Sequence, residues 1–156
     1  MDKLPIDRIL TSPLRRARQT AQAVAVGRGI PVLVEEDIVE MAFGELEGQL
    51  LSDFPACECI FSDPEHYVPL EGGESYAQLD VRCRKLLEEI LPPLEGRFHD
   101  VVLVSHGAFI RGVVCRVLGL PLKDFWDAPP QPNCSCTVLE LKNGVCTLVE
   151  EGRVYG

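Results

Sequence analysis

The chain has 156 residues, and we expect a single domain over residues 1–156. Hydrophobic residues make up 46% of it and charged residues 25%, which is typical of a soluble globular protein. The formal net charge of −9 argues against nucleic acid or an anionic membrane as the main partner, so an anion site must be a local basic feature. The opening MDKLPIDRIL has no basic region followed by an apolar one, which favours a cytoplasmic location.

The seven cysteines indicate reduced thiols, and their odd number excludes complete intrachain pairing. Two pairs, Cys57/Cys59 and Cys134/Cys136, have spacers of one residue, shorter than structural zinc sites usually have. Alternation along a strand would place Cys134 and Cys136 on one face as small buried apolar residues. We therefore expect no bound metal.

The first third of the chain predicts a strand, a helix and a second strand. Residues 6–12 are typical of a short buried strand, and residues 12–29 of a helix. Ser12 is the expected cap of that helix and Pro13 suits its first turn, while two glycines end it. Residues 30–37 predict the next strand.

The middle of the chain predicts a long loop followed by a helix. Residues 39–73 are irregular and rich in proline, glycine and acidic residues, which indicates a functional loop carrying one short helix. Residues 76–91 have an apolar face at helical spacing. Ser75 and Gln78 form a capping box, and Pro92–Pro93 end the helix.

The last third predicts one more strand and helix and then a hairpin. The strand covers residues 101–105 and the helix 107–120, while the runs 134–141 and 145–152 flank Asn143-Gly144, a strong hairpin signal. Alternating strands and helices followed by a hairpin predict an α/β fold, with a mostly parallel sheet and helices on both faces.

Two strand-to-helix junctions carry the residues best suited to chemistry. Ligands of open α/β sheets bind outside the carboxyl ends of the strands. In TSPLRRARQT, Arg15, Arg16 and Arg18 follow a strand, and in VSHGAF, His106 and Gly107 do. Arginines and free amides at a helix start suit a phosphoryl group, although solvated arginines and a hydrogen-bonded strand-end histidine are the common alternatives.

A carboxyl group is the third candidate. Glu40, in VEMAFGELEG, follows an apolar run. A carboxylate beside a phosphate is costly unless it is protonated, and a protonated one is a general acid. Glu45 and Glu47 are expected to be ordinary exposed acids.

In this order, TSPLRRARQTA, VEMAFGELEG, LEGGESY and VSHGAFIRG resemble the histidine phosphatase family, also called the phosphoglycerate mutase-like family. PQPNCSCTVLEL resembles its terminal hairpin, so the likeness covers nearly the whole chain from Ile6. The resemblance implies a three-layer α/β/α sandwich and phosphoryl transfer through a phosphohistidine, with no cofactor.

The resemblance also implies roles for residues of this chain. Arg16 matches the arginine that clamps the phosphate, Glu40 the acid that protonates the leaving oxygen, and His106 the histidine that stabilises the transferring group. The positions matched to the substrate pocket are Ser12, Glu74, Gly107 and Ala108.

One departure from the family concerns the nucleophile. The family's nucleophilic histidine lies in an Arg-His-Gly motif after its first strand, and this sequence contains no Arg-His-Gly. We expect an N-terminally incomplete domain in which the first strand is absent, with a gap between strands 101–105 and 134–141. That gap would be closed by direct pairing, by a strand from another copy or by a further segment, and a homodimer is the expected outcome for the 156 residues alone.

Two classes of function stay open. The first is a phosphatase, or less readily a mutase, that acts on small phosphomonoesters in a complete parent protein, while the 156 residues alone are inactive. The second is a noncatalytic phosphate-binding protein or scaffold. Sugar phosphates, nucleotides, phosphoglycerate and a cobalamin-precursor phosphate all stay open as substrates.

Overall fold

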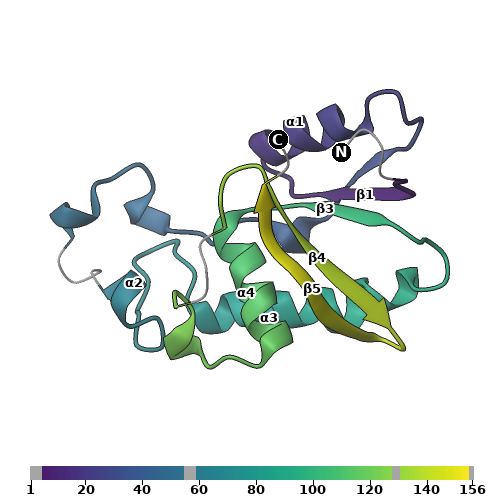
Figure 1. Cartoon of the computed structure of the whole chain (residues 1–156). Coiled ribbons are helices and arrows are strands. Elements are labelled where there is room, and N and C mark those ends of the chain that lie inside the picture. Colours follow the sequence, from purple (N-terminus) through teal and green to yellow (C-terminus); the bar gives the residue numbers. More distant parts are fainter. Residues whose placement is uncertain (1–4, 55–58, 128–130, 155–156) are drawn as a thin grey trace.

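Strands and helices alternate along most of the chain, and a hairpin closes it (Figure 1). The structure is a computed structural model that describes residues 5–54, 59–127 and 131–154. The strands are β1 (Arg8–Thr11), β2 (Val32–Val34), β3 (Val101–Val104), β4 (Ser135–Lys142) and β5 (Val145–Val154). The α-helices are α1 (Arg15–Ala25), α2 (Cys59–Ser62), α3 (Tyr76–Lys85) and α4 (Gly107–Leu118).

The first three strands form a parallel sheet with β1 at its centre. The order is β2-β1-β3, and Thr11, the last residue of β1, aligns with Val34 and Val104, the last residues of its neighbours. Helix α1 covers one face of this sheet, and α3 and α4 lie on the other (Figure 1). The predicted α/β fold with helices on both faces is confirmed.

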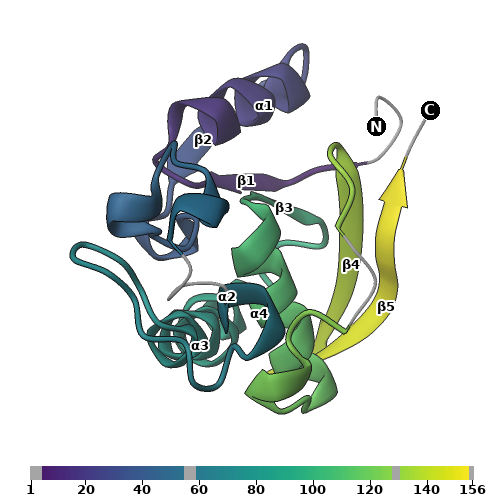
Figure 2. The same ribbon diagram turned by 90° about the vertical axis from the view of Figure 1, so that its left-hand side faces the viewer.

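The predicted terminal hairpin also forms. Strands β4 and β5 pair antiparallel around Asn143 and Gly144, both of which have positive φ, at 53° and 74°. Positive φ at both central residues is the requirement of a type I′ turn, which explains the Asn-Gly pair. The carboxylate of Glu95 accepts hydrogen bonds from both turn amides, at 2.6 and 2.8 Å. The hairpin lies beside α4 (Figure 2).

The hairpin and the parallel sheet stay separate. Among the described residues, β3 pairs only with β1 and β4 only with β5. Direct pairing of β3 with β4 was one of the three expected ways to close the gap, and it does not occur between these strands. All four residues of β3 are half-buried, whereas Ile9 and Leu10 of the central strand are buried.

The first helix is not capped as predicted. It begins at Arg15, and its N-cap residue is Leu14, which makes no side-chain capping bond. The hydroxyl of Ser12 accepts a hydrogen bond from the Leu14 amide at 3.3 Å, but it also lies 2.7 Å from Nε2 of His106. The predicted role of Ser12 as helix cap is therefore wrong, because Leu14 is the N-cap residue and the Ser12 hydroxyl contacts His106.

Helices α3 and α4 pack closely and carry much of the core. The predicted capping box of Ser75 and Gln78 is present at the start of α3. The α-helix ends at Lys85, earlier than predicted, and continues as a π-helical turn over Leu86–Ile90. A Cβ added to Gly112 of α4 would lie 2.8 Å from the Cys83 sulfur, so only glycine allows this close approach.

The long loop between β2 and α3 has little regular structure. In the described residues it contains short 3₁₀ turns at Glu36–Ile38, Gly44–Leu46 and Leu51–Asp53 and the single helix α2, which agrees with the predicted loop and one short helix. Ile38 and Met41 are almost fully buried, at 0% and 1% exposure. No helix in the described part of the chain is long and apolar enough to cross a membrane.

Candidate functional site

The carboxyl ends of β1 and β3 bring two distant segments together. Because Thr11 aligns with Val104, the residues that follow each strand are neighbours, and the Ser12 amide donates to the Val104 carbonyl at 2.9 Å. Ser12 and His106 are both buried. The register of a parallel pair therefore builds the centre of the site.

Arg16 and His106 contact each other at this centre. Arg16 Nε donates to His106 Nδ1 at 3.1 Å, and His106 Nε2 lies 2.7 Å from Ser12 Oγ. A guanidinium can only donate, so Nδ1 must accept and the proton of the neutral ring lies on Nε2. His106 therefore donates to Ser12 Oγ. The two junctions predicted to flank one phosphoryl group do meet.

The environment of His106 keeps its ring neutral. Burial, and to a smaller extent the positive charge of Arg16, lower the pKa of His106 from its usual 6.5 to about 4. Only 7% of the residue is exposed. A bound anion would offset both effects, because it would stabilise the imidazolium beside the arginine.

Glu40 lies at the start of α4, on the long loop. Its Oε1 accepts from the Met41 amide at 3.0 Å and from the Phe109 amide at 3.2 Å. Phe109 is three residues beyond His106, so the carboxylate lies at the same helix end as the imidazole. Its second oxygen, Oε2, has no hydrogen bond to a described residue. Glu45 and Glu47 are exposed, as predicted.

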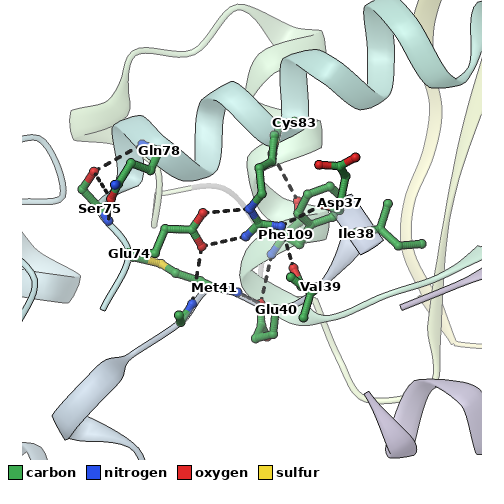
Figure 3. A network of polar contacts seen from close by, with 12 residues as sticks. Asp37, Ile38, Val39, Glu40, Met41, Glu74, Ser75, Gln78, Cys83 and Phe109 are labelled. Carbon is green, nitrogen blue, oxygen red and sulfur yellow. Dashed lines mark hydrogen bonds and ion pairs between the residues drawn. The ribbon is translucent and has the colours of Figure 1, made fainter. Parts of the chain in front are cut away.

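Glu74 lies beside the Glu40 loop, in an ion pair. Both of its carboxylate oxygens accept from Arg82, at 2.7 and 2.6 Å, and the two side chains are 14% and 17% exposed (Figure 3). Its predicted role in substrate binding stays a prediction. Arg82 was not among the residues predicted from the sequence.

A cavity of about 390 Å³ opens next to the helix start. It is lined by two of the predicted substrate-binding residues, Gly107 and Ala108, and by Glu40. The first-turn amides of α4 have no acceptor within the helix, and since that of Phe109 donates to Glu40, those of Gly107 and Ala108 are the ones available to an anion. The rest of the lining was missed by sequence analysis: Phe43 and Arg111 lie close in sequence to Glu40 and Gly107, and Trp126 and Gln131 come from a distant segment.

The other arginines and histidines lie elsewhere. Arg15 and Arg18 line a separate cavity of about 330 Å³ along α1, so only Arg16 of the arginine cluster contacts His106. His66 is exposed and lies 2.9 Å from Asp63. His99 precedes β3, at the opposite end of that strand from His106.

The described cysteines do not gather into a metal site. Cys83, Cys115, Cys134, Cys136 and Cys146 are free thiols, and no group of three or more potential metal ligands occurs among the described residues. Cys57 lies outside those residues. The expected shared face of Cys134 and Cys136 is wrong, because Cys134 is exposed with φ of 60° and precedes β4.

The chain is similar to proteins that act on phosphate esters. It is 32% identical over 125 residues to phosphoserine phosphatase 1 of Hydrogenobacter thermophilus, covering 78% of this chain and 58% of the relative. The chain thus spans less than two thirds of that relative.

Solved structures share its fold. Bacillus stearothermophilus YhfR has a TM-score of 0.88 and 28% identity, over 99% of this chain and 77% of its own. The mycobacterial glucosyl-3-phosphoglycerate phosphatase in complex with inorganic phosphate has a TM-score of 0.80 and 25% identity, over 96% of this chain and 78% of its own.

The family comparison covers almost the whole chain. The model of the histidine phosphatase superfamily (branch 1) matches residues 1–153, which include both strand ends, the Glu40 loop and the hairpin. The resemblance drawn from the sequence motifs is thereby confirmed, and the chain belongs to the histidine phosphatase superfamily.

Proposed function

We propose that the site binds the phosphoryl group of a small phosphomonoester and takes part in its hydrolysis. The observation that carries the proposal is the contact between the exposed Arg16 and the buried His106 at the carboxyl ends of two parallel strands. Arg16 supplies the permanent positive charge, and the first-turn amides of α4 supply further donors. The phosphatase relatives support the reaction class.

The cavity beside Glu40 suits the leaving group. Its walls include Phe43 and Trp126, together with Glu40 and the first residues of α4. Oε2 of Glu40, which has no partner among the described residues, would carry the proton that the leaving oxygen takes up. Hydrolysis is favoured over mutase activity because the compact chain has no evident insertion to hold a second phosphate.

The proposed route passes through a phosphohistidine on a residue other than His106. Both ring nitrogens of His106 are engaged, by Arg16 and by Ser12, which suits a group that stabilises phosphate rather than one that attacks it. His66 and His99 lie away from the site. We therefore expect the 156 residues alone to bind phosphate without turnover, and turnover to require a polypeptide that also supplies an Arg-His-Gly segment.

A noncatalytic phosphate-binding role is the second candidate. It is favoured by the same observation, that no second histidine of the described residues lies at the site. A phosphatase assay on protein of the mass of the 156 residues separates the candidates. Turnover that depends on Arg16 would contradict the expectation that these residues alone are inactive.

The test of the shared site is stabilisation by phosphate or vanadate. A ligand that binds the folded state raises the melting temperature by mass action. We expect Arg16→Ala and His106→Ala each to remove most of the shift. Arg18→Ala is the matched control, since Arg18 is on the same helix but lines the other cavity. An unchanged shift in both site variants would end the proposal.

The role of Glu40 is tested in protein that turns over. Poor leaving groups need protonation in the transition state, whereas nitrophenolate does not. Glu40→Gln should therefore slow alkyl phosphate hydrolysis far more than nitrophenyl phosphate hydrolysis. Equal losses on both substrates would remove Glu40 from the role of general acid.

We also propose a homodimer of the 156-residue chain. The outer edges of β3 and β4 have no strand partner among the described residues, and open edges recruit strands from other chains. Light scattering over a dilution series should give twice the chain mass. A monomer at every concentration would contradict the dimer.

We place the protein in the cytoplasm. Five of the described cysteines (Cys83, Cys115, Cys134, Cys136 and Cys146) are free thiols, which suits a reducing compartment. Fractionation of cells that produce the protein should recover it with cytoplasmic markers, and recovery with secreted or membrane fractions would contradict this.

A further inference from the structure

The loop that carries Glu40 is held by side chains rather than by a backbone ladder. Three consecutive carbonyls, those of residues 37, 38 and 39, accept hydrogen bonds from side chains of other segments. Arg82 Nη1 donates to the carbonyls of Asp37 and Val39, at 2.8 and 2.9 Å, and Ser105 Oγ donates to that of Ile38 at 2.7 Å. Ile38 is buried and its two neighbours are partly buried, so their carbonyls need such partners, since the backbone bridge of this loop in the described residues, between Phe43 and Gly73, lies further along.

Glu74 holds the backbone that follows Glu40 in the chain. Its amide donates to the Ala42 carbonyl at 2.7 Å, and its Oε2 accepts from the Ala42 amide at 3.4 Å. The same carboxylate accepts two hydrogen bonds from Arg82. One largely buried ion pair therefore holds the backbone before and after Glu40, and Figure 3 shows the Glu74 carboxylate next to the segment from Asp37 to Met41.

The ion pair also reaches the helix end that Glu40 contacts. The Arg82 guanidinium lies over the Phe109 ring, 5.1 Å from its centre, and the Phe109 amide donates to Glu40 Oε1. Arg82 thus contacts the loop, Glu74 and the first turn of α4. These are the three segments whose relative placement decides where the Glu40 carboxyl points.

We propose that Arg82 and Glu74 are positioning residues that hold the Glu40 carboxyl toward the phosphoryl group bound by Arg16 and His106. The proposal rests on the proposed function. It concerns placement alone, since the cavity beside Glu40 contains neither Arg82 nor Glu74 among its lining residues. Lysine cannot replace Arg82, because a single ammonium cannot bridge a carboxylate and two carbonyls in the same plane.

The experiment measures how strongly Glu40 senses bound phosphate. Glu40→Gln keeps an oxygen for the Met41 and Phe109 amides and replaces the other oxygen with a donor. Inorganic phosphate should therefore bind about fivefold more tightly to Glu40→Gln than to the unmodified chain, by calorimetry at neutral pH. In the Arg82→Met background we expect this ratio to fall below about twofold, because the loop no longer presents residue 40 to the anion.

The ratio separates positioning from general structure. In the Arg82→Met background, the unpaired Glu74 charge weakens phosphate binding equally with and without Glu40→Gln. Its effect therefore cancels in the ratio of the two affinities. Arg116→Met is the matched control, since Arg116 pairs with Asp80 between α4 and α3, away from the loop. It should leave the fivefold ratio unchanged even though it lowers the melting temperature.

Each outcome decides a different point. A ratio that stays near fivefold in folded Arg82→Met overturns the positioning role. If Arg82→Met does not fold, Arg82→Lys carries the same comparison, because it keeps the charge beside Glu74, and an unchanged ratio there overturns the proposal too. If Arg16→Ala leaves phosphate affinity unchanged, the phosphate site itself, and with it the proposed function, is wrong.

Discussion

The two halves of the site are built in different ways. Arg16 and His106 follow directly from regular elements, since each comes just after a strand and the parallel register makes them neighbours. Glu40 lies on irregular chain, and side chains from α3 and the neighbouring loop hold its backbone. The first half therefore depends on sheet pairing, and the second on one largely buried ion pair, Arg82 with Glu74.

The largest expected effect is on the half held by the ion pair. Arg82→Met leaves Glu74 as an unpaired, largely buried charge and two backbone carbonyls without their donor, so we expect a loss of about 3–5 kcal/mol in the free energy of unfolding. Arg116→Met removes more exposed contacts, with Asp80 and Glu88, whose side chains are 37% and 59% exposed, and should cost about 1 kcal/mol or less. Urea denaturation of both variants measures the difference. Equal losses would mean that the two ion pairs carry similar weight.

The half held by the strands should respond to acid. The unfolded chain binds a proton on His106 near pH 6.5, whereas the folded chain, whose His106 pKa is lowered to about 4, does not. The unfolded state therefore binds more protons between these values, and stability falls as the pH drops through this window. The shift corresponds to a loss on the order of 3 kcal/mol.

The control for acid sensitivity is His106→Asn, which cannot be protonated. Its stability should fall less steeply between pH 6.5 and pH 4 than that of the unmodified chain. Parallel pH profiles for the two proteins would show that His106 titrates normally in the folded state.

The smallest effect concerns the contact between Ser12 and His106. Ser12→Ala removes the acceptor of the buried Nε2 proton, and leaving a buried donor unsatisfied costs about 1–3 kcal/mol. Because Ser12 does not cap α1, the loss should arise at the site, and His106→Asn should remove most of it. If Ser12→Ala lowers the free energy of unfolding as much in the His106→Asn variant as in the unmodified chain, the loss arises at the start of α1 instead.

The same contrast explains what the sequence could predict. Both junctions of the first half were predicted, because an apolar run followed by arginines or by Ser-His-Gly is a local signal of a strand end. Glu40 was predicted through resemblance to a family, and its neighbours in the chain gave no signal of how its loop is held. Arg82 was missed because it is one of several charged residues on a helix. The two backbone carbonyls that it binds, those of Asp37 and Val39, lie more than forty positions away in sequence.

The cavity lining and the sheet edge show the same limit. Trp126 and Phe43 reach the cavity from loops whose paths are set by tertiary packing, so no sequence pattern marks them. The expected gap beside β3 followed from comparison with the family's strand order. What the chain does at that edge could not be decided, since pairing depends on the placement of the hairpin against α4.

The most direct test of the central claim is the pKa of His106, measured by NMR with and without inorganic phosphate. The account predicts a value near 4 in the free chain that rises when phosphate binds, because the anion stabilises the imidazolium. Arg16→Ala should raise the value in the free chain but leave it below 6.5, since burial is the larger cause, and should abolish most of the response to phosphate. A pKa near 6.5 that phosphate does not change would contradict a shared phosphate site of Arg16 and His106.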